Sequence, residues 1–266
     1  MMDNESEEQI QDQAQEQDHE QLPVSGPPLL MVNNLTKRFG KKVAVDGLSL
    51  QVRPGECLGV VGPNGAGKTT LIRTICTLLY FKDGTIEVGG HNIRKDPLEA
   101  KRLFGYVAEV PNPYELLTVW EHVSFIARAY GMRGWEKLAE EMIEEFDLKE
   151  KRDEFVRYLS KGQKQKVSII CAFIHKPKLL LLDEPVIGID AKGVRALKRR
   201  IQELQNSGGA ILISAHMLHF VEDVATRIMI IDDGRSMAEG TLAELKEKYF
   251  TDGNLEDLVI KITSGD

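Results

Sequence analysis

One short segment combines the residue types and spacing needed to hold a chain of phosphates. Residues 62–69 read Gly-Pro-Asn-Gly-Ala-Gly-Lys-Thr and fit the pattern G-x-x-x-x-G-K-[ST]. Glycines let the backbone curl so that N–H groups point at phosphate oxygens, and Lys68 can reach the β- and γ-phosphates. The Thr69 hydroxyl can ligate Mg²⁺. We therefore predict nucleotide binding by a phosphate loop made of Gly62, Pro63, Asn64, Gly65, Ala66, Gly67, Lys68, Thr69 and Thr70.

Two acidic residues end a run that predicts a buried strand. Residues 179–184 read Leu-Leu-Leu-Leu-Asp-Glu, and four leucines indicate a strand covered on both faces. A carboxylate there is costly unless it meets a cation or hydrogen-bond donors. Asp183 suits a Mg²⁺ site, and Glu184 can orient and deprotonate a water that attacks the terminal phosphate. Two acids at a solvated strand end are the plainer alternative, which the nearby phosphate loop disfavours.

The surrounding pattern predicts the elements that position these residues. An apolar run at 57–62 precedes the phosphate loop, and a helical period at 69–79 follows it, so the positive end of a helix faces the phosphates. In the second half of the chain, strands alternate with helices, which favours an α/β fold with a parallel sheet. Further strands are expected at 29–35, 43–52, 85–88, 178–185, 209–216, 227–234 and 235–240, and further helices at 118–131, 135–146, 162–175, 191–206, 217–225 and 241–249.

Composition and charge narrow the class of protein. The chain has 266 residues, of which 42% are hydrophobic and 28% charged, as is typical of a soluble globular protein. Its net charge is −7, but residues 1–22 carry eight acids and no Lys or Arg, so the remainder is close to neutral. A near-neutral body gives no electrostatic footprint for nucleic acid, and no nucleic-acid partner is expected. Residues 1–28 are expected to be a disordered acidic tail, with an acidic docking segment as the alternative.

The cysteines and the hydropathy pattern indicate in which cellular compartment the chain is expected. Cys57, Cys76 and Cys171 lie far apart, which favours small buried hydrophobic residues in a reducing compartment over a metal site or disulfides. No apolar run approaches the roughly 18–20 residues of a membrane span. The acidic N-terminus resembles neither a secretory signal nor a transit peptide. We therefore expect a cytoplasmic chain that does not itself cross a membrane.

The order of the motifs resembles the nucleotide-binding domain of ATP-binding cassette (ABC) transporters over residues 29–265. Residues 159–163 read Leu-Ser-Lys-Gly-Gln, where that family carries a signature near L-S-G-G-Q. The resemblance further matches Phe39 to an aromatic that stacks on adenine, Asp190 to the aspartate loop and His216 to the switch histidine. It implies a P-loop (RecA-like) core with a mostly parallel sheet, an antiparallel β-subdomain and an inserted α-helical subdomain. The implied ATPase domain spans residues 29–266, with the helical subdomain at about 107–175.

The signature segment, residues 159–163, also has a physical interpretation. Ser160 stands where an N-cap would begin the helix that follows. In the family, this helix end contacts the γ-phosphate held by a second protomer, which assigns Ser160, Gly162 and Gln163 to ATP binding. One copy of each motif then implies a homodimer that closes on two ATP molecules and reopens after hydrolysis. An ordinary helix cap is the alternative.

Two residues depart from the family pattern. Glu109 stands where the lid loop usually carries Gln, and Lys161 replaces the first signature glycine. Glu109 can still accept hydrogen bonds and meet Mg²⁺, but it adds a negative charge and lacks the amide donor. Because Glu184 and His216 are both present, the resemblance still implies ATP hydrolysis, with Lys68, Glu184 and His216 catalytic and Thr69, Asp183 and Glu109 around Mg²⁺.

Two further stretches, 106–132 and 254–263, resemble a subgroup of export-type ABC ATPases. Such subunits work with a separate integral membrane permease, so the resemblance implies a peripheral position on the cytoplasmic face of the cell membrane. The alternative is a soluble ABC ATPase without a permease, of the kind used in iron–sulfur cluster assembly. The transported substrate lies outside what this sequence specifies, because a permease subunit would select it.

Overall fold

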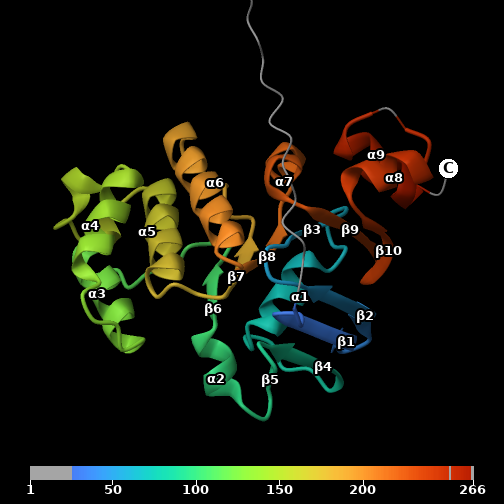
Figure 1. Cartoon of the computed structure of the whole chain (residues 1–266), viewed down its shortest axis with the longest axis horizontal. Helices are drawn as coiled ribbons and strands as arrows, with labels where there is room; N and C mark the ends of the chain where they lie inside the picture. Colours follow the sequence, from blue (N-terminus) through green and yellow to red (C-terminus); the bar gives the residue numbers. More distant parts are fainter. Residues whose placement is uncertain (1–25, 252, 265–266) are drawn as a thin grey trace, which may run out of the picture.

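The computed structural model describes residues 26–251 and 253–264 and contains two β-sheets flanked by helices (Figure 1). The larger sheet has six strands in the order β10-β9-β3-β8-β7-β6. All neighbouring pairs are parallel except β10 with β9, which confirms the mostly parallel α/β core expected from the sequence. The strands are β3 (Cys57–Val61), β6 (Phe104–Val107), β7 (Leu179–Asp183), β8 (Ala210–Ser214), β9 (Arg227–Asp232) and β10 (Arg235–Gly240).

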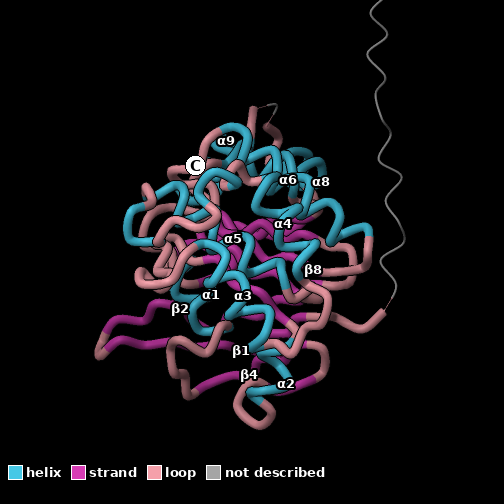
Figure 2. Tube along the Cα trace, turned by 90° about the vertical axis from the view of Figure 1, so that its left-hand side faces the viewer, coloured by secondary structure: helices cyan, strands magenta, loops and turns pink. Residues whose placement is uncertain are grey.

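The smaller sheet is antiparallel and carries the aromatic side chain at residue 39. Its order is β2-β1-β4-β5, formed by β1 (Leu30–Phe39), β2 (Lys42–Val52), β4 (Asp83–Val88) and β5 (His91–Asn92). Strands β1, β2 and β4 lie together beside helix α1 in both views (Figures 1 and 2). Phe39 pairs with Lys42 at the tip of the β1–β2 hairpin, so the register places its ring at the end of the sheet.

The helices fill the connections between the strands. α1 (Lys68–Ile75) follows β3, and α3, α4 and α5 are inserted between β6 and β7 and gather at one side of the molecule (Figure 1). A capping box closes the N-terminus of α3 through Thr118 and Glu121, and another closes α5 through Ser160 and Gln163. The remaining bounds are α2 (Pro97–Arg102), α3 (Val119–Ala129), α4 (Glu136–Glu145), α5 (Lys161–Ile174), α6 (Ala191–Asn206), α7 (Leu218–Val224), α8 (Leu242–Lys248) and α9 (Leu255–Ser264).

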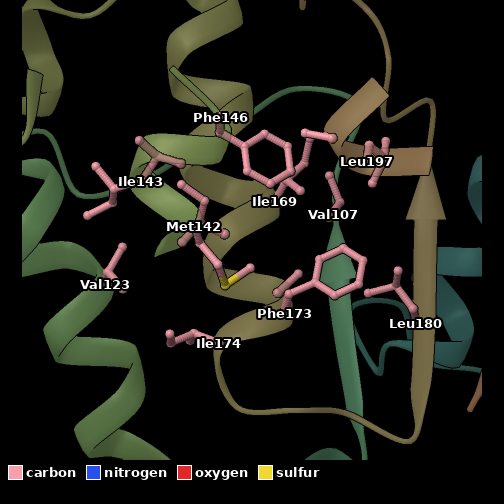
Figure 3. Close-up of a cluster of buried hydrophobic side chains, with 14 of the residues drawn as sticks. Val107, Val123, Met142, Ile143, Phe146, Ile169, Phe173, Ile174, Leu180 and Leu197 are labelled. Carbon is pink, nitrogen blue, oxygen red and sulfur yellow. The ribbon is translucent and has the colours of Figure 1, made fainter. Parts of the chain in front are cut away.

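A continuous hydrophobic cluster joins the inserted helices to the parallel sheet. Phe146 at the end of α4 is fully buried and lies near Ile169 of α5, and Leu197 of α6 belongs to the same cluster (Figure 3). Val107 of β6 belongs to the same cluster. Burial of such side chains contributes about 1.5–3 kcal/mol each, so the insert docks firmly on the core. This packing places Gln165 of α5 at the strand end that carries the acidic residues, with its Nε2 3.3 Å from Pro185 O.

Several elements differ from the sequence-based prediction. The helix expected at 69–79 ends at Ile75, because Thr77 adopts a left-handed φ of 62°. The prediction omitted β5, α2, β6 and α9. The first three are short, whereas the buried residues of α9 recur at helical spacing and would have supported a helix there, at Leu255, Leu258, Val259 and Ile262. The expected bounds of the ATPase domain and the helical subdomain remain predictions. Residues 1–25, which make up most of the expected tail, lie outside the described part of the chain.

Two further expectations concerned buried cysteines and the lack of a membrane-spanning helix. All three cysteines are free; Cys57 and Cys76 are buried as expected, whereas Cys171 is half-buried and its sulfur lies 3.2 Å from His122 Nδ1. Across residues 26–251 and 253–264, the helices are too short or too polar to traverse a bilayer.

Candidate active site

The phosphate loop connects the end of β3 to the start of α1. Gly62 and Gly67 adopt φ values of 148° and 107°, which L-amino acids with side chains rarely take. A Cβ on Gly62 would lie 2.0 Å from the carbonyl oxygen of Ile231, and one on Gly67 would lie 2.3 Å from that of Ala44. Glycine is therefore required at both positions by conformation and by space. The free N–H groups at the start of α1 open onto the loop and suit an anion.

Lys68 is held inside this loop. Its side chain is buried, and Nζ donates hydrogen bonds to the carbonyl oxygens of Gly62 at 2.6 Å and Pro63 at 3.0 Å. Burial lowers the pKa of Lys68, while the nearby charges of Glu184 and Asp183 raise it. The ammonium group is therefore positioned where phosphate oxygens would meet it.

Asp183 joins the phosphate loop to the parallel sheet. Its Oδ1 accepts hydrogen bonds from the hydroxyls of Thr69 and Ser214, each at 2.9 Å. Its Oδ2 is buried and has no hydrogen-bond partner among the described residues, and Arg73 Nε lies 4.0 Å away. Burial raises the pKa of Asp183. A buried, unpaired carboxylate oxygen beside a threonine hydroxyl is a donor set that fits Mg²⁺, which prefers oxygen ligands.

Glu184, the next residue, is held in an unusual backbone conformation. Its φ is 51°, in the left-handed region, and its N–H donates to Ser214 O at 3.0 Å. Oε2 accepts the backbone N–H of His216 at 2.7 Å, and His216 Nε2 lies 3.5 Å from Oε1. Desolvation raises the pKa of Glu184, and the His216 hydrogen bond partly offsets this. A carboxylate with a raised pKa is suited to accept a proton from water.

A pocket of about 250 Å³ gathers most of the predicted residues. It brings together Phe39, the loop from Asn64 to Thr70, Glu109, Glu184 and His216. Phe39 is 47% exposed, so its ring is available for stacking. Lys42 and Ala44 also line the pocket, and the prediction missed both. Their alternation on the strand after Phe39 is the signal that could have placed them on the same face.

The signature residues and Asp190 lie outside this pocket. Ser160 Oγ accepts the N–H of Gln163 at 3.2 Å, and Gln163 Oε1 accepts the N–H of Ser160 at 2.9 Å, so the two form a helix cap. A Cβ on Gly162 would lie 2.0 Å from the carbonyl oxygen of Gly188. Asp190 caps α6 through the N–H of Gly193 and pairs with Lys166 Nζ at 2.7 Å. Within one chain, each of these residues therefore has a structural role.

Comparison with known proteins identifies the family. The model of the ABC transporter family matches residues 45–187. The ABC-type transporter ATP-binding protein EcsA of Bacillus subtilis is 36% identical, over 90% of this chain and 98% of its own. The daunorubicin resistance ATP-binding protein DrrA3 of Streptomyces coeruleorubidus is 35% identical, over 87% and 73%.

Solved structures agree with the sequence matches. A structure described as the ATP-binding subunit of an ABC transporter has a TM-score of 0.84 and 34% identity, covering 88% of this chain and 99% of its own. CbiO1 of Clostridium perfringens, part of the transporter complex cbiONQ, has a TM-score of 0.68 and 26% identity, covering 84% and 92%. With the phosphate loop, the acidic strand end and the signature segment all in place, the chain belongs to the ABC transporter family, as an ATP-binding subunit that hydrolyses ATP.

Proposed function

We propose that two copies of this chain enclose two ATP molecules and power an export permease from the cytoplasmic face of the membrane. The observation that carries the proposal is the position of Ser160. It is exposed at the N-terminus of α5, away from the pocket of its own chain, where a phosphate bound by a second copy could meet it. Gly162, Gln163 and Asp190 would complete that contact from the same face.

Within each pocket, different residues of the chain bind the nucleotide, hold Mg²⁺ and activate the attacking water. Phe39 stacks on the adenine, the loop N–H groups hold the phosphates, and Lys68 turns from its two carbonyl partners toward the β- and γ-phosphates. Thr69, Asp183 and Glu109 would hold Mg²⁺, which when bound neutralises charge on the phosphate oxygens. Glu184 removes a proton from the attacking water, and His216 keeps the Glu184 carboxylate oriented.

A groove along α3 is where we place the permease contact. It is about 520 Å³ and is lined by Trp120, Glu121, Ser124, Phe125, Arg128 and Ala129. Tyr114 meets Phe125 edge to ring at 5.6 Å, and both side chains are exposed. Exposed aromatic residues beside an arginine are typical of protein interfaces. Membership of the family implies a membrane permease as partner. Export is the direction suggested by relatives named for drug resistance and Nod factor export.

The first experiment uses Glu184→Gln, which should still bind ATP but should not hydrolyse it. The tagged variant is pulled down with ATP from detergent-solubilised membranes, next to the same variant carrying Phe125→Ala. Co-elution of a polytopic membrane protein, lost with Phe125→Ala, supports the proposal. Recovery of soluble partners alone would favour an assembly ATPase without a permease.

Light scattering tests the dimer, since ATP should double the molar mass of Glu184→Gln but not that of Glu184→Gln combined with Ser160→Ala.

A further inference from the structure

Gln165 is a buried amide between two loops of the active site. It lies on α5, and its side chain is 0% exposed. Its Nε2 donates to the carbonyl oxygen of Ala108 at 3.1 Å and to that of Pro185 at 3.3 Å. Ala108 directly precedes Glu109, and Pro185 directly follows Glu184. One side chain therefore connects the backbones that carry two carboxylates of the nucleotide pocket.

The chemistry of these contacts requires an amide. Both acceptors are carbonyl oxygens, so only the NH₂ side of the Gln165 amide can face them. Its Oε1 is buried and lacks a partner within the residues that the structure describes. An apolar side chain of the same length would avoid the unpaired acceptor, but it would leave both carbonyl groups without this donor. The site therefore uses the Nε2 donor of Gln165 twice and leaves its Oε1 acceptor without a partner among the described residues.

Helix α5 is a fixed support for this contact. Its first turn presses on the loop before α6, since a Cβ on Gly162 would lie 2.0 Å from Gly188 O. Its last turns press on β6, since a Cβ on Gly105 would lie 2.2 Å from Ala172 O. Backbone contacts at both ends leave α5 little room to slide, so Gln165 is anchored relative to the sheet.

We propose that Gln165 is a positioning residue for ATP hydrolysis, which holds the Glu109 loop and the Glu184 strand end in their reactive arrangement. The proposal rests on the roles given above to Glu109 and Glu184. Gln165 lies five residues after Ser160 on the same helix. It therefore links the pocket of its own chain to the helix end that would meet the ATP of a second copy.

The test compares Gln165→Met with Ser168→Ala in the full chain. Methionine keeps the length of the side chain but lacks the donor. Ser168 Oγ donates to Lys164 O at 3.1 Å within α5, so Ser168→Ala serves as the matched control. We expect Gln165→Met to lower kcat by about 10- to 100-fold, because small misplacements of reacting groups carry costs of that order. We expect KM for ATP to stay within about twofold, because the phosphate loop is untouched. Ser168→Ala should change neither parameter.

Hydrogen–deuterium exchange gives an independent readout of the loops. Gln165→Met, but not Ser168→Ala, should speed exchange at the amides of residues 107–110 and 184–188. This readout does not depend on which residue is the base, so it separates a failure of this proposal from a failure of the Glu184 assignment. If Glu184→Gln still turned over ATP, the base assignment would fall, whereas exchange at these amides would still show whether Gln165 holds the two segments in place.

Gln165→Glu is the second variant, to be used should Gln165→Met fail to fold. A glutamic acid can donate a hydrogen bond to a carbonyl group only when it is protonated. The kcat of Gln165→Glu, relative to that of the wild type, should therefore recover as pH is lowered toward 5.5. The proposal is overturned if kcat of the folded Gln165 variants stays within about twofold of the wild type, or if KM for ATP alone changes. It is also overturned if Gln165→Glu shows no recovery of kcat, relative to the wild type, at low pH.

Discussion

The backbone N–H of His216 donates to Oε2 of Glu184 at 2.7 Å, and the imidazole Nε2 of His216 lies 3.5 Å from Oε1. The histidine therefore meets both oxygens of one carboxylate, through its backbone and its ring. The same glutamate has a φ of 51°, a conformation that a long side chain adopts at some energetic cost. These contacts keep the carboxylate aimed into the pocket despite that strain.

Replacement of His216 by Ala should slow hydrolysis while sparing ATP binding. The backbone N–H to Glu184 remains in the variant, but the ring contact is lost, so the carboxylate gains freedom. We expect kcat to fall by about 10- to 100-fold, measured as phosphate release under saturating ATP. His219→Ala is the control, since His219 is exposed and its Nδ1 pairs with Glu222 at 3.2 Å, outside the pocket. Equal losses in both variants would contradict a specific role for His216.

The pH dependence of turnover should reflect the raised pKa of Glu184. A base must be deprotonated to act, and desolvation raises the pKa of Glu184 above its ordinary value of 4.5. Activity should therefore fall as pH decreases, with the midpoint of the acid limb above 4.5. The measurement is kcat between pH 5 and 8, over the range in which the fold is stable. Constant kcat from pH 8 down to pH 5 would refute the assignment.

Replacement of Asp183 by Asn should stabilise the protein without nucleotide and weaken its response to Mg²⁺ and ATP. Burial raises the pKa of Asp183, so the native state disfavours the charged form that dominates at neutral pH. Removing that charge should raise Tm, by about 2–4 °C for each 1 kcal/mol gained in the free energy of unfolding. The added stability from Mg²⁺ with ATP should shrink, because the variant lacks one of the carboxylate oxygens proposed to hold Mg²⁺. A lower Tm without nucleotide would show that the ionised form is favoured in the native state.

Gly162→Ala should destabilise the fold. Its Cβ would approach Gly188 O to 2.0 Å, so the loop before α6 must move. Overpacking of this kind costs about 1–3 kcal/mol in the free energy of unfolding, which urea denaturation can measure. Lys161→Ala, an exposed neighbour in the same turn, should stay within about 0.5 kcal/mol of the wild type. Equal stabilities for the two variants would count against the close contact.

Phe39→Ala should weaken ATP binding. Stacking of a base on an aromatic ring contributes about 1–3 kcal/mol, or roughly 5- to 150-fold in Kd. Phe39→Trp should retain affinity because it keeps an aromatic face. Equilibrium binding of a fluorescent ATP analogue to the three proteins provides the comparison. An unchanged Kd in Phe39→Ala would place the adenine elsewhere.

Local sequence was sufficient for the parts of the site whose chemistry lies within a few consecutive residues. The phosphate loop, the leucine-rich strand with Asp183 and Glu184, and the cap at Ser160 each depend on neighbours in the chain, and the structure has the predicted elements at all three. Periodicity also predicted the parallel sheet, because strands alternating with helices can hardly be connected otherwise.

Contacts between distant segments could not be predicted in this way. Neither the hydrogen bonds from Gln165 to Ala108 and Pro185 nor the pairing of Lys166 with Asp190 has a local signal. Lys42 and Ala44 entered the pocket through the register of a hairpin, and β6 was too short to show a period. Each of these features depends on which surfaces the hydrophobic core brings together, because only packing of the whole chain fixes the distance between segments far apart in sequence.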